Sequence, residues 1–562
     1  MSNLTHRLTK SLFAASRDCI HYEGLWYSTL QLENDMATVM ILLKDAGVCA
    51  QDRVVLDYPN SYAFLVAYLA ILHSGAVVVP VNPELKPAEL QTILKRSQAA
   101  FGFFHTDVKA TLDAICEHNS DIALRVIFTS SELQQGAPQF VWSDKVGDTI
   151  GDPEAHAVLR ASRVARVSYA SRVSGVSGVS GVSGVSGVSG VRGVRGVPGV
   201  SREAREVSDD NPALLMYTSG TTGRPKAVVL KHRHLLAAAE NIIDAHNLTQ
   251  ADVAYCFLPL FHINAQVVAV LSTLLSGGRI VLAPRFSASR FWNTIEDYKV
   301  TWVSAVPTVI SILQNGDGPD IPPASLRFVR SASAQLPQLV ALRFERRFGI
   351  PVIQSYGMTE AASQICVNPL PPGERRSDSV GLPMGVELRI VDENGTDVAT
   401  GAVGEVVLRG PNVIEAYEDV PNQDDFRNGW FYTGDMGRRD TSGYVYLTGR
   451  KKELINRAGE KISPYEVEDI IREIPEVEQV AVIGLPDALY GEQVAAYVVP
   501  RGSTCAKELE SLANEILRAC RQALSKYKWP SGIKFVAEIP VGPTGKVQRT
   551  NLKQQILSSM IS

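Results

Sequence analysis

The segment Tyr217–Lys226 combines glycine, hydroxyl and lysine residues in a pattern that suits the binding of a phosphate group. Gly220 and Gly223 have no Cβ, so the backbone amides beside them can approach an anion closely. Lys226 adds a positive charge on a long, mobile side chain. Three hydroxyl groups can donate hydrogen bonds to phosphate oxygens, those of Ser219, Thr221 and Thr222. The segment is therefore a candidate phosphate loop.

This candidate loop differs from the Walker phosphate loop. In the Walker pattern a glycine and a lysine are followed by serine or threonine at the start of a helix, whereas Pro225 precedes Lys226 and Ala227 follows it. A surface turn rich in Gly, Ser and Thr would explain a shorter match. Ten successive residues, however, resemble the signature of the adenylate-forming superfamily, which includes acyl-CoA synthetases, luciferases and the adenylation domains of peptide synthetases. The resemblance implies that this loop, with Thr218 among its members, binds the phosphates of ATP.

Two further motifs follow in the order of this family. The run LPLFHINAQ resembles the motif at a strand end whose histidine lines the acyl pocket beside the carboxylate, which implies that role for His262. By itself, a histidine in an apolar run is more often a core residue. The run SYGMTE is similar to the adenine and metal segment. The resemblance implies adenine packing for Tyr356 beside Gly357, a hydrogen bond to the α-phosphate for Thr359, and Mg²⁺ binding for Glu360.

Four charged residues nearer the carboxy terminus extend the resemblance. It implies that Asp435 in GWFYTGDMG accepts both ribose hydroxyls, and a carboxylate with two oxygens suits such a diol. Arg450 in LTGRKKELI would lie over the same sugar and the phosphate, and Lys452 matches the hinge about which a small domain rotates. Lys546 in PTGKVQR stands where the family has its catalytic lysine, whose ammonium would bridge the attacking carboxylate and the α-phosphate.

The stretch RAGEKISPYEVE around Gly459 is especially similar to that of free-standing acyl-CoA synthetases such as the fatty-acid, coumarate and oxalate enzymes. Gly459 has no Cβ and would let a pantetheine arm pass close to the backbone. The resemblance implies an ATP-, Mg²⁺- and CoA-dependent ligase that converts a carboxylic acid to acyl-AMP and then to acyl-CoA. A ligase that loads an acyl carrier protein would share every motif. A non-catalytic nucleotide-binding relative is the alternative from another class, and a luciferase-like oxygenase fits less well, because nothing here requires oxygen chemistry.

The partner acid is a small molecule, and the sequence favours an apolar tail, fatty or aromatic. Small residues in RSASAQLP, residues 330–337, and the apolar run HINAQVVAV support this expectation. We find no carrier-protein sequence at either end, which disfavours a modular peptide synthetase, and the segment from SYGMTE to TGD is not expanded as it is in fatty acyl-AMP ligases.

Hydrophobic periodicity predicts the elements that position these motifs. From Val39 to Val81, helical spacing alternates with buried strand-like runs such as RVVLDY and AVVVPVN, which indicates β-α-β units. The alternation returns after Ala213, with AVVL, RIVLAP, TWVSAVP and PVIQSYG as strands of a second layer. The apolar stretch from Ala63 to Leu72 is too short to span a bilayer and reads as a buried helix. We expect an α/β multidomain protein with two doubly wound subdomains.

The last third of the chain predicts two smaller units. Frequent turn residues from Asn412 onward predict a small β-barrel-like subdomain. After Arg450, helical and strand-like segments follow one another and predict a separate α+β domain, with a serine-capped helix at ISPYEVEDIIREIP. We therefore expect an AMP-binding domain over residues 1–448 and a mobile catalytic lid over 449–562. Nine Val-x-Gly triplets at 173–199 read as a flexible linker or an expanded repeat without chemistry of its own.

The overall composition excludes some classes of protein. Across 562 residues, Lys+Arg of 55 against Asp+Glu of 59 gives a formal net charge of -4, without the basic surplus typical of nucleic-acid binding. The seven cysteines include no CxxC pair, which suits a reducing cytoplasm. The polar amino terminus lacks the apolar core of a secretory signal. We expect a cytoplasmic protein without a transmembrane segment or a nucleic-acid partner.

Overall fold

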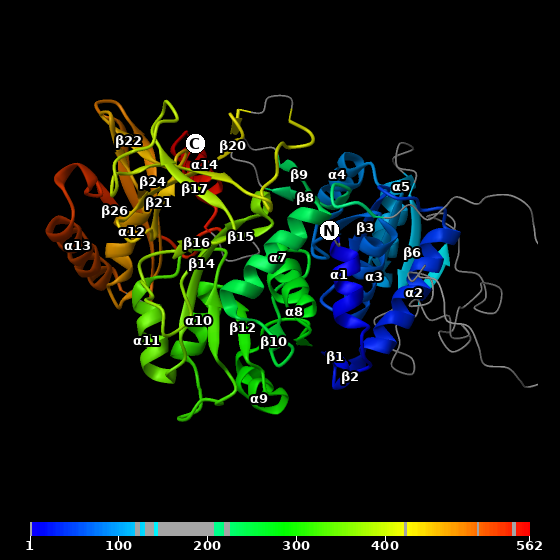
Figure 1. The fold of residues 1–562 in the computed structure, drawn as a ribbon. Coiled ribbons are helices and arrows are strands. Elements are labelled where there is room, and N and C mark those ends of the chain that lie inside the picture. Colours follow the sequence, from blue (N-terminus) through cyan, green and yellow to red (C-terminus); the bar gives the residue numbers. More distant parts are fainter. Residues whose placement is uncertain are drawn as a thin grey trace, which may run out of the picture.

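The computed structural model describes residues 3–117, 124–129, 140–143, 207–218, 225–420, 424–502, 505–541 and 547–561. Several of the predicted features lie outside the described residues: the Val-x-Gly tract at 173–199, the loop residues Ser219, Gly220, Thr221, Thr222 and Gly223, and Lys546. The described chain forms four β-sheets. In Figure 1, the amino-terminal elements in blue and the carboxy-terminal elements in orange and red lie at opposite ends of the molecule, with the green elements between them.

The first sheet has seven strands in the order β7-β6-β5-β3-β4-β8-β9. Its strands are β3 (Arg53–Asp57), β4 (Val77–Val81), β5 (Phe101–His105), β6 (Arg125–Thr129), β7 (Phe140–Ser143), β8 (Pro212–Thr218) and β9 (Lys226–Lys231). The interior strands pair in parallel, as continuous apolar runs buried on both faces predict. The helices in this part of the chain are α1 (Leu4–Leu12), α2 (Thr29–Asp45), α3 (Tyr62–Ser74), α4 (Pro87–Ser97) and α5 (Lys109–Glu117). Every residue of α3 from Tyr62 to His73 is buried, which confirms the predicted buried helix.

The second sheet has nine strands in the order β16-β15-β14-β13-β12-β10-β11-β1-β2. Its central strands are β10 (Val253–Cys256), β11 (Arg279–Leu282), β12 (Trp302–Ala305), β13 (Phe328–Ser331) and β14 (Val352–Met358). Its edges are β1 (Asp18–Tyr22), β2 (Leu25–Ser28), β15 (Ser363–Val367) and β16 (Leu382–Pro383). The assignment of AVVL to this layer was wrong, because that run is β9, which pairs antiparallel with β8 in the first sheet. A connection of seven residues is too short for a parallel crossover, so the two strands must form a hairpin.

Helices cover both faces of the second sheet. One apolar cluster packs the strands against α9 (Ala288–Tyr298), α10 (Pro307–Asn315) and α11 (Gln338–Phe348). The other face packs against α7 (His232–His246), the π-helix η3 (Asn264–Leu271) and α8 (Ser272–Leu275). This second cluster also contains side chains of α3 and β3, so one apolar core joins the two α/β layers. The first two sheets with their helices therefore form the two α/β subdomains that the sequence predicted.

The small third sheet is antiparallel and consists of β17 (Glu387–Val391), β18 (Gly404–Arg409), β19 (Phe426–Arg427), β20 (Trp430–Arg439) and β21 (Val445–Arg450). The sheet begins at Glu387, whereas the frequent turn residues after Asn412 predicted a later start. The reason is that β17 and β18 are short, mostly buried strands that precede Asn412, and their apolar residues resemble those of the α/β layers before them.

The carboxy-terminal unit is α+β. Its strands are β22 (Ile455–Arg457), β23 (Glu460–Ile462), β24 (Val477–Asp487), β25 (Gly491–Pro500) and β26 (Gly532–Phe535), and its helices are α12 (Pro464–Arg472), α13 (Ala506–Ala523) and α14 (Arg549–Ile561). The chain changes sheet between Arg450 and Ile455, close to the boundary that we propose at residue 449. Ser463 is the N-cap residue of α12, but its hydroxyl donates to the Thr448 carbonyl instead of capping the helix.

No helix in the described part of the chain combines the length and the apolar character that a membrane-spanning segment needs.

The buried histidines make the stability of the fold dependent on pH. Burial lowers the pKa of six histidines, to about 4 for His232, His234 and His262, and His21, His73 and His246 shift in the same direction. In the unfolded chain histidine titrates near pH 6.5, so the unfolded state binds more protons between about pH 6.5 and 4. The free energy of unfolding should therefore fall as the pH is lowered through this window.

We expect urea denaturation to give a free energy of unfolding at least about 2 kcal/mol lower at pH 5 than at pH 7. His232→Gln, which removes one buried titrating ring, should weaken this pH dependence. His6→Gln, at an exposed position, is the matched control and should leave it unchanged. A free energy of unfolding that is constant between pH 7 and pH 5 would contradict the prediction.

Candidate active site

The candidate site lies at one edge of the second sheet. Strands β10, β12, β13 and β14 are parallel, so their carboxyl ends meet at the same edge. This is the edge at which open α/β sheets bind ligands. Two predicted motifs follow directly from these strands: His262 comes six residues after the end of β10, and Thr359 and Glu360 come immediately after β14.

Tyr356, Asp435 and Arg450 form one hydrogen-bonded group. The Tyr356 hydroxyl donates to Oδ2 of Asp435 (2.5 Å), and Nε of Arg450 donates to Oδ1 of the same carboxylate (2.7 Å). Asp435 and Arg450 are direct partners in the register between β20 and β21, which explains how residues 15 positions apart meet. Burial and the adjacent Asp435 charge raise the pKa of Tyr356, which keeps the phenol protonated as a donor. The structure thus brings together three residues that the sequence predicted for nucleotide binding.

Gly357 is required by the close approach of two strands. A Cβ at this position would lie 1.4 Å from the carbonyl oxygen of Ser363. The register between β14 and β15 shifts between Tyr356 and Gly357, so the bulged strand turns here into the short helix η4 (Thr359–Ala361). The glycine thereby fixes the position from which Thr359 and Glu360 project.

Glu360 is linked to Lys226 through Tyr417, a residue that the sequence interpretation missed. The Tyr417 hydroxyl donates to Oε1 of Glu360 (3.0 Å), and Nζ of Lys226 lies 4.3 Å from the centre of the Tyr417 ring. Lys226 also forms an ion pair with Asp425. Burial raises the pKa of Glu360, and burial followed by the Glu360 charge raises that of Tyr417. Neither Tyr417 nor Asp425 lies in a recognisable motif, so no sequence signal identified them.

The base of the candidate phosphate loop is held in place by Arg96. Thr218 and Lys226 are paired across the β8–β9 hairpin, which brings the two ends of the loop together. The Arg96 guanidinium lies 4.8 Å from the centre of the Tyr217 ring and donates to the Pro225 carbonyl (2.7 Å). Arg96 thus contacts β8 and the residue immediately before β9, one at each end of the loop.

His262 lies in the turn between β10 and η3. Its Nε2 atom is buried and has no hydrogen-bond partner among the described residues. Burial lowers the pKa of His262 to about 4, so the ring is neutral near pH 7. A neutral ring with an unpaired nitrogen can offer a hydrogen bond to a bound molecule.

Lys452 and Gly459 follow this group in the chain, where the carboxy-terminal unit begins. Lys452 is exposed in the turn between β21 and β22, where the chain passes from the third sheet to the carboxy-terminal sheet. Gly459 is exposed at the tip of the β22–β23 hairpin with φ +91°, a conformation that favours glycine. Among the described residues, no hydrogen bond or ion pair joins Gly459 to Tyr356, Asp435 or Arg450.

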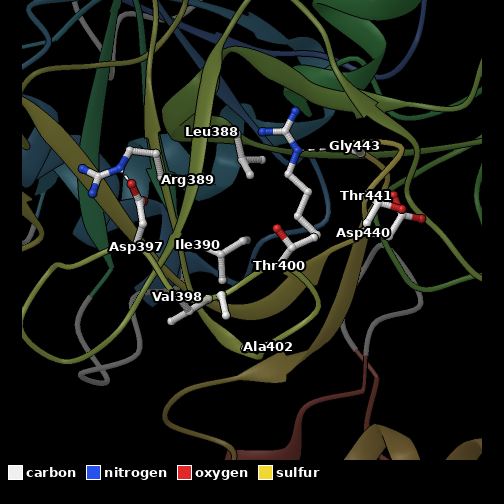
Figure 2. Close-up of a pocket in the computed structure, with 12 residues that line it drawn as sticks. Leu388, Arg389, Ile390, Asp397, Val398, Thr400, Ala402, Asp440, Thr441 and Gly443 are labelled. Carbon is white, nitrogen blue, oxygen red and sulfur yellow. Dashed lines mark hydrogen bonds and ion pairs between the residues drawn. The ribbon is translucent and has the colours of Figure 1, made fainter.

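A hollow of about 380 Å³ on the third sheet is separate from the candidate site. Figure 2 shows Arg389 and Asp397 paired at one wall, with Asp440 and Thr441 on the other side. No predicted site residue lines this hollow. Its walls are strand side chains and turns, and we assign it no role.

Comparison with known proteins places the chain in a family. Residues 13–418 match the family model of AMP-binding enzymes, and residues 466–546 match that of the AMP-binding enzyme C-terminal domain. The chain is 45% identical over 347 residues to a sulfoacetate–CoA ligase of Cupriavidus necator, covering 61% of this chain and 67% of that one. It is 34% identical to an oxalate–CoA ligase of Arabidopsis thaliana, covering 92% and 90%.

A solved structure agrees with this placement. ATP-bound MatB from Rhodopseudomonas palustris superposes with a TM-score of 0.81 at 26% identity, and the match covers 99% of this chain and 98% of MatB. The similarity to AMP-binding enzymes therefore includes the three-dimensional fold of nearly the whole chain. The chain belongs to the family of AMP-binding enzymes.

Proposed function

We propose that this enzyme activates a carboxylic acid with ATP and transfers the acyl group to CoA. In the first half-reaction, a carboxylate oxygen attacks the α-phosphorus of ATP, the bond to the β-phosphate oxygen breaks, and pyrophosphate leaves. In the second, the CoA sulfur attacks the acyl carbon of acyl-AMP, its C–O bond to the phosphate breaks, AMP leaves, and the thiol proton passes to solvent. The observation that supports this most directly is the Tyr356–Asp435–Arg450 group beside Glu360.

In this proposal the group forms the nucleoside end of the site. Asp435 accepts the ribose hydroxyls with the lone pairs that Tyr356 and Arg450 leave available, because each carboxylate oxygen can accept more than one hydrogen bond. The Tyr356 ring packs against adenine. The loop from Thr218 to Lys226 holds the phosphates, and Thr359 donates to the α-phosphate.

Glu360 is the residue that we propose for Mg²⁺. Its Oε1 atom already accepts the Tyr417 hydroxyl, which orients the carboxylate and directs Oε2 away from the tyrosine. The described residues contain no cluster of three or more His, Cys, Asp or Glu that could hold a metal alone. One carboxylate combined with substrate phosphates is a usual donor set for Mg²⁺, which would offset the charge of the phosphate oxygens when bound.

The position of Lys226 suits a change of partner on nucleotide binding. The lysine is paired with Asp425, whose side chain is 39% exposed, whereas that of Lys226 is 15% exposed. An ion pair with a partly exposed carboxylate is weak. We propose that Lys226 exchanges Asp425 for a phosphate oxygen when ATP is bound.

The second half-reaction requires the carboxy-terminal unit to rotate about Lys452. Gly459 lies in an exposed hairpin on that unit, and the hairpin would face the acyl-adenylate after rotation. CoA is the acceptor that the relatives' names support. An acyl carrier protein is the second candidate, since both acceptors present the same pantetheine thiol.

The names of the relatives point to two kinds of acid, and the indoleacetate and fatty acids named by some of them agree with the apolar tail that the sequence predicted. Oxalate and sulfoacetate each have a second acidic group, whereas the sequence alone predicted an apolar tail. A suitable experiment measures ATP–pyrophosphate exchange across acids of both classes and then AMP release with CoA or with a phosphopantetheinylated carrier protein. We expect exchange with at least one acid and AMP release with CoA. Exchange with none would contradict the adenylation proposal, and AMP release only with the carrier protein would contradict CoA as the acceptor.

A further inference from the structure

Arg330 is a fully buried cation without a counter-ion. It lies on β13 with 1% of its surface exposed, the largest buried side chain after Trp302. No Asp or Glu of the described chain lies within ion-pair distance of it. Its Nη1 atom donates to Oδ1 of Asn264 (3.2 Å) and to Oγ of Ser304 (3.4 Å), and its buried Nε has no partner there. Both partners are neutral, so the charge is not compensated.

Two other arginines of the described chain show what Arg330 lacks. Arg327, three residues earlier, forms an ion pair with the buried Asp252 and donates to the His246 carbonyl (2.8 Å). Arg375 pairs with Glu345 (3.2 Å). Arg330 is more deeply buried than either and lacks such a carboxylate. The described chain therefore leaves its most buried arginine unpaired, whereas these two more exposed arginines have carboxylate partners.

The groups around Arg330 do not supply a negative charge. His246, on α7, interacts electrostatically with Arg330, but burial and the charges of Arg330 and Arg327 hold the pKa of His246 well below its usual range, so that ring is neutral. Burial lowers the pKa of Arg330 to about 9, which still leaves it charged at neutral pH. Burying an ion without a partner costs several kcal/mol. The arrangement is thus more favourable when an anion is bound.

Arg330 belongs to the same sheet edge as the candidate active site. It is the next-to-last residue of β13, directly beside Ser304 of β12, and the β13–β14 register places it next to Ile353, three residues before Tyr356. Its partner Asn264 comes two residues after His262 and also donates to Oγ of Ser333 (3.3 Å). Asn264 begins the π-helix η3, a form of helix that is frequent at functional sites.

We propose that Arg330 binds a second anionic group on the acid that the enzyme activates, so that the substrates are short acids with a carboxylate or sulfonate at the far end. Asn264 orients the guanidinium through Nη1, which leaves Nε free to donate to the anion. This inference rests on the proposed adenylation of a carboxylic acid. It replaces the apolar tail that the sequence favoured, because an apolar tail would leave the charge of Arg330 unpaired.

The test uses the full-length enzyme and pairs of acids matched in length. ATP–pyrophosphate exchange is measured with malonate against propionate, succinate against butyrate, and sulfoacetate against propionate. We expect kcat/KM for the preferred dianionic acid to exceed that of its monoanionic partner by about 100-fold, the effect of one buried charge pair. Exchange confined to monoanionic acids would overturn the role of Arg330 while leaving the proposed function intact. Exchange with no acid at all would instead overturn the proposed function.

Two variants separate recognition from folding. Asn264→Asp places a carboxylate beside Nη1 of Arg330 with little change of volume, so an internal ion pair should compete with the substrate anion. We expect it to lower kcat/KM for the dianionic acid by about 100-fold and to have a melting temperature at least as high as that of the wild type, because the buried charge gains a partner. Arg330→Met removes the unpaired charge, and we expect the variant to be at least as stable as the wild type and to lose the preference for dianionic acids.

Arg327→Met is the matched control. It removes an arginine that has a carboxylate partner, so it should lower the melting temperature because Asp252 is left unpaired, yet keep the preference between acids. The KM for ATP, measured in the same assays, should be unchanged in Asn264→Asp and in Arg330→Met. A wild-type acid preference in Asn264→Asp or in folded Arg330→Met would overturn the proposal.

Discussion

The Lys546→Ala variant should lose adenylation and keep thioester formation. Lys546 lies outside the described residues, and its proposed role rests on its place in the PTGKVQR motif. An ammonium that bridges the carboxylate and the α-phosphate stabilises charge that develops only as phosphorus becomes pentacoordinate. Its removal should slow ATP–pyrophosphate exchange on the order of 1,000-fold. The attack of a thiol on preformed acyl-AMP involves no such phosphorus centre.

The measurement compares the two half-reactions in one preparation. Exchange reports the first, and AMP release from supplied acyl-AMP and CoA reports the second, which should stay within about threefold of the wild type. Lys553→Ala is a suitable control, because Lys553 lies in the same carboxy-terminal unit and pairs with Glu492 (2.7 Å) away from any motif. Equal loss of both half-reactions in Lys546→Ala would contradict the proposal that Lys546 acts only in the first half-reaction.

The Asp435→Asn variant should weaken ATP binding strongly. The carboxylate accepts from both Tyr356 and Arg450, and an asparagine would turn an N–H donor towards one of these two donors. The lost charge-assisted hydrogen bond should raise the KM for ATP by about 10- to 100-fold. The free energy of unfolding should fall by about 2 kcal/mol, since Arg450 is left without its partner in a mostly buried position.

Asp440→Asn provides a closely matched control. Asp440 follows the end of the same strand, β20, and likewise accepts from one arginine, Arg376, and one tyrosine, Tyr446 (3.0 Å). It lines the separate hollow on the third sheet instead of the candidate site (Figure 2). Asp440→Asn should therefore lower stability without changing the KM for ATP. If the KM for ATP rises equally in both variants, the weaker ATP binding of Asp435→Asn would result from a disturbed third sheet and not from a lost contact with the nucleotide.

The fold was predicted well where periodicity was strong. The alternation of apolar strands and helices predicted two α/β layers, and the fully apolar run in α3 predicted a buried helix. One error concerns which sheet a strand joins. The run AVVL has the same composition whether it belongs to the first or the second sheet, and the pairing of β8 with β9 decided the matter. Strand composition reports burial, whereas sheet membership depends on partners distant in the sequence.

The sequence by itself determined the order of the motifs and, through them, the family of the enzyme. Loop glycines, hydroxyls and charges act over a few residues, so their spacing alone is informative. Only the tertiary structure placed Tyr417 between Lys226 and Glu360, joined Tyr356 and Arg450 at Asp435, and left Arg330 without a counter-ion. These relations depend on which charges share one low-dielectric space, and several of them join residues far apart in the sequence, such as Tyr356 and Asp435, which are 79 positions apart.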